Sequence, residues 1–196
     1  IKLSPMLSLE SQVSDIADDL TYYGHDVDDG LDSGLIKTGD LCSLVLWKDA
    51  TELSVALGNT EKIPSHIIRC LIDSMVKDVI LNTDNNLNKM NIKTPEEAQL
   101  LTQRIVCFSD KYKKTTDELK DFLYANLYKN EEVMKINRAS AVKLEKLFRF
   151  YLSNPTHGND FIQERSKIDG LALATCYYIA GMTYRFALAE YEKHCT

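Results

Sequence analysis

Glycine and proline are scarce in this chain, which has eight glycines and four prolines among 196 residues. The alternation of apolar and polar residues that marks half-buried strands is also missing. Because few residues that interrupt helices are present, the sequence predicts an all-α fold. The length suits one domain or a piece of a larger one.

The chain also lacks the features of a membrane, secreted or nucleic-acid-binding protein. No apolar run reaches the length that spans a bilayer, and the first residues do not form a signal peptide. The formal net charge is −6, so no overall basic surface favours nucleic acid. The cysteines stand singly, without the spacing of a zinc site, which predicts reduced thiols in a cytoplasmic protein. They are Cys42, Cys70, Cys107, Cys176 and Cys195.

What the chain does have is an acidic segment near its start. Asp18, Tyr22 and Asp26 are four residues apart, a spacing that puts all three on one face of a helix. Like charges one turn apart cost roughly 0.2–0.5 kcal/mol per pair, so a bound cation would stabilise such a cluster. A solvated acidic face is the alternative interpretation. An apolar stripe at helical spacing predicts the buried face of the same helix: Leu9, Val13, Ile16 and Leu20.

The rest of the chain predicts further helices separated by short polar segments. Thr94, Pro95 and Glu97 form a strong helix start, because they combine an N-cap, a proline at the first position and a capping-box glutamate. Helices are predicted over 41–57 (one or two short ones), 63–81, 116–128, 139–152 and 168–194. Residues 25–36, which include Gly30 and Gly34, predict a turn or a broken second helix; residues 82–93 predict a fraying helix or the start of a loop, and residues 155–160 predict a loop.

Residues 9–31 resemble the signature of the deoxynucleoside triphosphate triphosphohydrolases, the dGTPase-like branch of the HD superfamily. That signature reads like L-E-A-Q-V-x-D-I-A-D-D-I-A-Y-x-x-H-D-x-D-D-G-L, and nearly every position is matched here. The resemblance continues through 122–128, 147–155 and 178–183. Tyr177 and Tyr184 depart from it, because they stand where the family usually has aspartate.

The resemblance implies a multi-helix bundle of the HD-domain type and makes this chain the C-terminal half of a larger helical enzyme. In that arrangement residues 1–36 contribute the last metal-ligand motif, and residues 37–196 form the helical C-terminal region. The chain opens at Ile1 without an initiator methionine. We therefore expect it to be a fragment.

By position, the resemblance implies that Asp18 is the final ligand of a divalent metal, which would be Mn²⁺, Mg²⁺ or Fe²⁺. It implies that Tyr22 packs on the sugar of the substrate, that Asp26 accepts a hydrogen bond from the sugar 3′-hydroxyl, and that Tyr128 is a second sugar-side tyrosine. The implied reaction is hydrolysis of a dNTP to a deoxynucleoside and triphosphate. We expect Asp18 to share one cleft with Tyr22 and Asp26.

The other metal ligands of the family, a histidine and a His-Asp pair, lie upstream of this motif, and no histidine precedes His25 here. Although His25 and Asp26 spell such a pair, we expect His25 to be a surface residue. No catalytic residue is expected within this segment, and the metal is expected only together with the missing N-terminal half. The segment alone is therefore predicted to be inactive.

A second hypothesis comes from a different class of function. The chain would be a non-catalytic helical module for assembly or binding, left from a split or truncated gene, and the departures at Tyr177 and Tyr184 mildly favour it. The family further implies a homo-oligomer with a nucleotide effector. Neither a membrane nor a nucleic acid is an expected partner.

Overall fold

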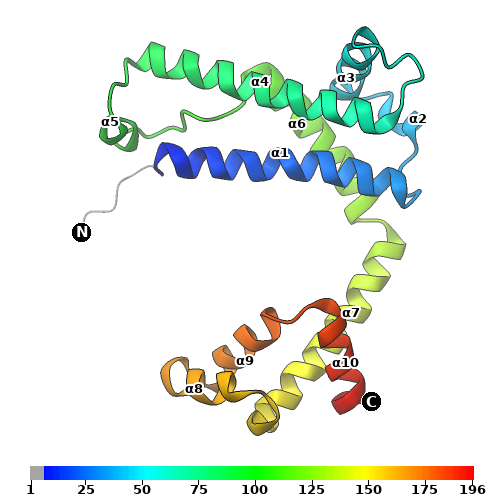
Figure 1. Cartoon of the computed structure of the whole chain (residues 1–196), viewed down its shortest axis with the longest axis vertical. Coiled ribbons are helices and arrows are strands. Elements are labelled where there is room, and N and C mark those ends of the chain that lie inside the picture. Colours follow the sequence, from blue (N-terminus) through cyan, green and yellow to red (C-terminus); the bar gives the residue numbers. More distant parts are fainter. Residues whose placement is uncertain (1–6) are drawn as a thin grey trace. The chain divides into compact units, whose positions relative to one another are not determined.

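The computed structural model describes residues 7–196, which form helices connected by short loops (Figure 1). No strand occurs among these residues, so the all-α prediction is confirmed. The HD-type bundle implied by the family resemblance stays a prediction. No helix within 7–196 is long and apolar enough to cross a membrane.

The chain divides into two compact units. The larger unit ends at Asn130, and the smaller unit comprises Glu131–Thr196. The larger unit contains α1 (Leu9–Asp32), α2 (Thr38–Leu41), α3 (Val45–Ala56), α4 (Pro64–Met90), α5 (Pro95–Gln99), α6 (Asp110–Leu123) and a π-helical turn (Tyr124–Tyr128). The smaller unit contains α7 (Glu131–Ser153), a 3₁₀ turn (Pro155–His157), α8 (Asp160–Asp169), α9 (Leu171–Ala180) and α10 (Tyr184–Cys195).

In the larger unit, α1 and α4 run side by side, and α3 packs against α4 (Figure 1). Their apolar faces meet in one core, which includes Val27, Trp47, Leu71, Met75 and Leu119. The core of the smaller unit is built on Leu147, Tyr151 and Ile162. Each unit therefore has its own hydrophobic core.

The first helix is longer than the sequence predicts, because α1 continues through Gly24 and Gly30 to Asp32. The prediction of a break from residue 25 is wrong. Both glycines are buried and allow close packing: a Cβ on Gly24 would lie 2.5 Å from Ile72 Cδ1, and one on Gly30 would lie 2.5 Å from Ile36 Cδ1. The turn comes afterwards, at Gly34, whose φ is +73°.

The polar segment 82–93 is mostly helix, not the predicted fraying end or loop, because α4 runs on to Met90. Asn82 and Asn86 explain the difference, since their side-chain amides donate hydrogen bonds to the carbonyl oxygens of Cys107 and Ile105, at 2.9 and 3.0 Å. These polar side chains suggested the end of a helix, but in the structure they bind α4 to the segment that precedes α6. Asn91, with φ of 53°, ends the helix in the left-handed conformation.

The single long helix predicted over 168–194 is also wrong. The structure has two helices there, α9 and α10, separated at Gly181. Thr183 begins the second one, because its hydroxyl accepts a hydrogen bond from the Phe186 amide. The predicted start at Thr94 is confirmed: its hydroxyl accepts from the Glu97 amide at 3.3 Å, and the helix begins at Pro95.

Candidate nucleotide site

The acidic motif lies on α1, which the sequence starts and orients. The Ser8 hydroxyl caps the helix by accepting a hydrogen bond from the Ser11 amide at 3.2 Å. The predicted apolar stripe is partly wrong, because Val13 is 52% exposed. Ile16 and Leu20 are buried as predicted, and Gln12 takes the buried position in place of Val13. The buried stripe then continues through Gly24, Val27 and Gly30.

Gln12 is the main structural residue of the motif that sequence reasoning missed. Its side chain is fully buried, and its Oε1 accepts hydrogen bonds from the amides of Ile105 and Val106, at 2.9 and 3.2 Å. Its Nε2 donates to the carbonyl of Leu7 at 2.9 Å. This one amide therefore joins the start of α1 to a segment more than 90 residues away. The sequence signal for this role was a glutamine at a position of the helix that otherwise apolar or small residues occupy.

Asp26 and Tyr128 are brought together, as the family resemblance implies for two sugar-side residues. The Tyr128 hydroxyl donates a hydrogen bond to Oδ2 of the half-buried Asp26, across 102 positions of sequence. Tyr128 ends the π-helical turn that follows α6. Such turns widen a helix locally and occur frequently at functional sites.

The pKa of Tyr128 is raised to about 12, first by burial and then by its hydrogen bond to the Asp26 carboxylate. Tyr22 and Tyr23 lie close enough for their phenols to raise the pKa further. Tyr128 is therefore a hydrogen-bond donor throughout the physiological pH range. Since it engages Oδ2 of Asp26, Oδ1 of that carboxylate is left for another donor.

Tyr22 is 57% exposed, so its ring is available to a ligand beside the Asp26–Tyr128 pair. Asp18 is exposed one turn before it and borders an open depression of about 710 Å³. This depression is lined by Ser11, Ser14, Asp15 and Thr21 among others, and by neither Tyr22 nor Asp26. This depression is therefore not the single cleft that we expected Asp18 to share with Tyr22 and Asp26. The roles of Asp18, Tyr22, Asp26 and Tyr128 stay predictions.

Within residues 7–196, no group of three or more histidine, cysteine, aspartate or glutamate side chains is arranged to hold a metal ion. His25 is exposed beside Asp26 on α1. Asp15, near Asp18, is paired with Arg104 across the larger unit. By themselves, the described residues do not fit a divalent metal.

Comparison with known proteins agrees with the resemblance seen in the motif. The sequence profile of the phosphohydrolase-associated domain matches residues 106–193. A deoxyguanosinetriphosphate triphosphohydrolase-like protein of Geobacter sulfurreducens is 32% identical over 189 residues, which is 95% of this chain and 49% of that protein. The chain is therefore similar to dGTPase-like proteins over nearly its whole length.

Two further dGTPase-like relatives give the same picture. The Leptospira interrogans protein is 32% identical over 95% of this chain and 50% of its own length. The Rickettsia peacockii protein is 30% identical over the whole chain and 53% of its own length. The chain therefore spans about half the length of these curated relatives. The matched domain region includes Tyr128 and most of the smaller unit.

In the smaller unit, Tyr177 and Tyr184 are exposed. The Arg165 guanidinium lies 5.5 Å from the centre of the Tyr177 ring, so a cation–π contact occupies one of the positions where the family usually has aspartate. The unit's buried polar contact, missed by sequence reasoning, is a hydrogen bond from the Tyr151 hydroxyl to the Glu190 carboxylate.

Proposed function

We propose that this chain is the C-terminal helical part of a metal-dependent hydrolase that converts a dNTP to a deoxynucleoside and triphosphate. One structural observation carries the proposal: the hydrogen bond that pairs Asp26 with Tyr128 across 102 positions of sequence. The kinship with dGTPase-like proteins supports it.

The pair has the chemistry that recognition of a sugar hydroxyl needs. Tyr128 stays protonated, because its pKa is raised to about 12, and its hydroxyl holds one oxygen of Asp26 in place. The other oxygen of Asp26 accepts from a sugar hydroxyl, while the exposed ring of Tyr22 packs against the sugar. A site built around such a hydrogen bond discriminates strongly against substrates that lack the hydroxyl.

In this proposal Asp18 supplies one carboxylate ligand for a divalent metal. The remaining ligands come from the half of the relatives' length that this chain does not span, because residues 7–196 hold no suitable group of three. A single exposed carboxylate binds a divalent metal too weakly to fix it. We therefore expect the chain alone to release no triphosphate from dGTP with Mn²⁺.

A chimera tests the proposal with a complete protein. Residues 1–196 replace the matched half of the Geobacter sulfurreducens relative, and triphosphate release from dGTP is measured with Mn²⁺, with the intact relative as reference. We expect turnover in the chimera. Asp18→Asn should lower the turnover of the chimera by more than about 100-fold. Loss of a residue that only supports a metal ligand costs about 10–100-fold, and loss of the ligand itself should cost more. Asp26→Asn should raise KM more than it lowers kcat.

Asp73→Asn is the matched control, since Asp73 is an exposed acid of α4 that pairs with Lys77. It should leave turnover unchanged. If the chimera is folded by circular dichroism and active, but Asp18→Asn behaves like Asp73→Asn, the assignment of Asp18 is wrong. If the folded chimera is inactive beside an active relative, the proposed function is wrong for this chain.

A further inference from the structure

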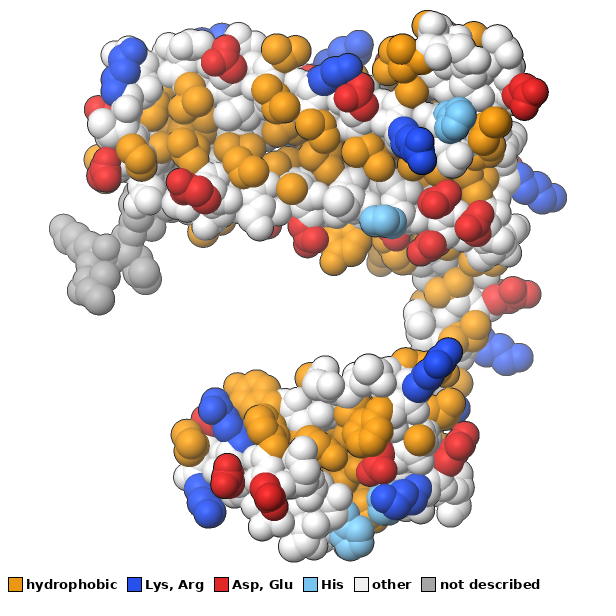
Figure 2. Space-filling model, in the orientation of Figure 1, with side chains coloured by type: hydrophobic (Ala, Val, Ile, Leu, Met, Phe, Trp, Pro, Cys, Tyr) orange, Lys and Arg blue, Asp and Glu red, His pale blue; other side chains and the backbone are white. Residues whose placement is uncertain are grey.

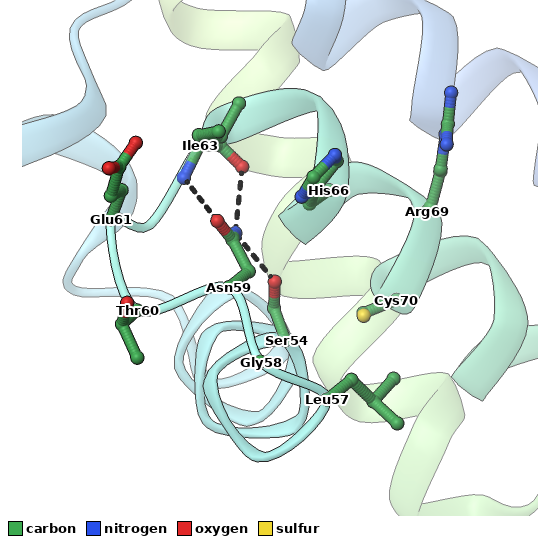
Figure 3. Close-up of a pocket in the computed structure, with 10 residues that line it drawn as sticks. All are labelled: Ser54, Leu57, Gly58, Asn59, Thr60, Glu61, Ile63, His66, Arg69 and Cys70. Atoms are coloured by element: carbon green, nitrogen blue, oxygen red, sulfur yellow. Dashed lines mark hydrogen bonds between the residues drawn. The ribbon is translucent and has the colours of Figure 1, made fainter.

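A second depression lies in the larger unit, away from the acidic motif. It has a volume of about 550 Å³ and is bordered by the end of α3, the loop over 57–63 and the first turns of α4 (Figure 3). That volume lies within the range of about 300–1,000 Å³ that is typical of small-molecule sites. None of Asp18, Tyr22, Asp26 and Tyr128 borders it.

The loop that forms one wall is held in place by Asn59. Its Nδ2 donates hydrogen bonds to Ser54 Oγ at 2.8 Å and to the Ile63 carbonyl at 3.3 Å, and its Oδ1 accepts from the Ile63 amide at 3.2 Å (Figure 3). Gly58, with φ of +100°, makes the turn that this arrangement needs. Because one side chain ties the loop to α3 and to the start of α4, the wall is fixed before any ligand arrives.

The opposite wall carries two nitrogen-bearing side chains without partners. His66 and Arg69 are three residues apart on α4, so they lie on one face of the helix. Within residues 7–196, neither side chain makes a hydrogen bond or ion pair. Both side chains are exposed, so they are free to contact a ligand in the depression.

We propose that this depression binds a small phosphate monoester. The fork of the Arg69 guanidinium matches phosphate oxygens in pairs, and the His66 imidazole donates a further hydrogen bond. His66 lies in the first turn of α4, where the helix dipole also favours an anion. Leu57 and Ile63, which are 74% and 40% exposed, offer an apolar surface to the organic part of the ligand.

Glu61 determines the orientation in which the ligand binds. Glu61 borders the depression from the loop (Figure 3). A carboxylate at this position repels the negative charge of a phosphate. The phosphate is therefore held against α4 and the organic group against the loop. An acid on one wall also favours a single phosphate over an extended polyphosphate.

The test is a titration of the full 196-residue chain with phenyl phosphate, followed by amide chemical shifts in ¹H–¹⁵N NMR spectra. Phenol and inorganic phosphate serve as probes of the two halves of the ligand. We expect shifts concentrated at residues 54–70, with phenyl phosphate bound more tightly than either probe. Arg69→Gln should raise the Kd about 10-fold or more, since it removes charge-assisted hydrogen bonds.

Lys77→Gln is the matched control, because it removes one positive charge from the same helix at a residue already paired with Asp73. It should leave the Kd within about twofold, as expected for a distant exposed charge. Arg69→Lys keeps the charge but loses the fork, and we expect an intermediate Kd. An equal loss of affinity in Lys77→Gln and Arg69→Gln overturns the proposal. Chemical-shift changes located away from residues 54–70 would also overturn the proposal, as would phenol that binds as tightly as phenyl phosphate. Both of these results come from the wild-type chain, so they do not depend on whether a variant folds.

Discussion

The two units of this chain are stabilised in different ways. In the larger unit, apolar side chains of several helices form the core. The amides of the buried Gln12 and of the half-buried Asn82 and Asn86 attach the segment 105–107 to α1 and α4. In the smaller unit the core is built on Leu147, Tyr151 and Ile162, and its central polar contact is the Tyr151–Glu190 hydrogen bond. Figure 2 shows apolar side chains exposed on the visible face of each unit.

This difference indicates how much stability each unit can lose on substitution before it unfolds. Small units bury a smaller fraction of their surface and have less stability to lose. The larger unit has more core, and Gln12 additionally anchors the start of its motif helix. The sole tryptophan of the chain, Trp47, is buried in the larger unit, so its fluorescence reports on that unit, whereas far-ultraviolet circular dichroism reports on both.

The largest expected effect is on the smaller unit. Leu147 is fully buried, so Leu147→Ala should lower the free energy of unfolding by about 3 kcal/mol through lost burial and the cavity that remains. In urea, circular dichroism should show an early transition while the Trp47 transition stays in place. Leu144→Ala, at a residue of the same helix that is 44% exposed, should cost well under about 1 kcal/mol. A common shift of both signals would show that the units unfold together.

A somewhat smaller effect is expected in the larger unit. Gln12→Ala leaves the amides of Ile105 and Val106 without their acceptor, at a cost of about 2 kcal/mol. Here the Trp47 transition should move to lower urea concentration. Gln163→Ala, at an exposed position of α8, is the matched control and should change neither signal. An unchanged Trp47 transition in Gln12→Ala would contradict the anchoring role of this glutamine.

The smallest expected effect concerns the polar centre of the smaller unit. Tyr151→Phe removes a hydrogen bond to a charged group and should cost about 1.5 kcal/mol at neutral pH, measured by urea unfolding. Burial opposes ionisation of Glu190, but the hydrogen bond from Tyr151 and the charges of Lys193 and His194 outweigh it, so the pKa of Glu190 is lowered.

The sign of the pH dependence follows from that pKa. The pKa of Glu190 is lower in the folded than in the unfolded chain. The ionised side chain therefore stabilises the fold at pH values above its unfolded pKa of about 4.3. This stabilisation is lost as the pH falls through the folded pKa. Tyr151→Phe should shrink this acid loss. The pKa of Tyr151 is raised by burial and by Glu190, so the wild type should also lose stability as the pH rises above about 10. The variant should lose less, because only the raised pKa values of Tyr23 and Tyr128 then contribute among these tyrosines. Identical pH profiles for the two proteins would contradict this account.

Several elements could be predicted from local sequence, and the predictions that were wrong share one cause. The cap at Thr94 was correct, because it depends on spacing within one helix. Gly30 and Asn82 were misread as interruptions of helices. Both residue types end helices when exposed, but here another part of the chain packs against the glycine or accepts from the asparagine.

The candidate site divides in the same way. The family resemblance singled out Asp26 and Tyr128, and the fold joins them. Their hydrogen bond depends on where the π-helical turn after α6 places Tyr128 beside α1, which no local spacing reveals. The second depression, with His66 and Arg69, carries no motif and came only from the packing of a loop against a helix.

The sequence by itself determined that this chain is helical, where the helices that start at Pro64 and Pro95 begin, and that its first segment resembles the motif of the dGTPase-like proteins. These properties depend on side-chain periodicity and caps within a few residues. Only the tertiary structure decided which donor meets which acceptor: Gln12 with the amides of 105 and 106, Tyr128 with Asp26, and Tyr151 with Glu190. Such pairs join residues that are far apart in sequence, so their geometry is set by how helices pack rather than by how each one forms.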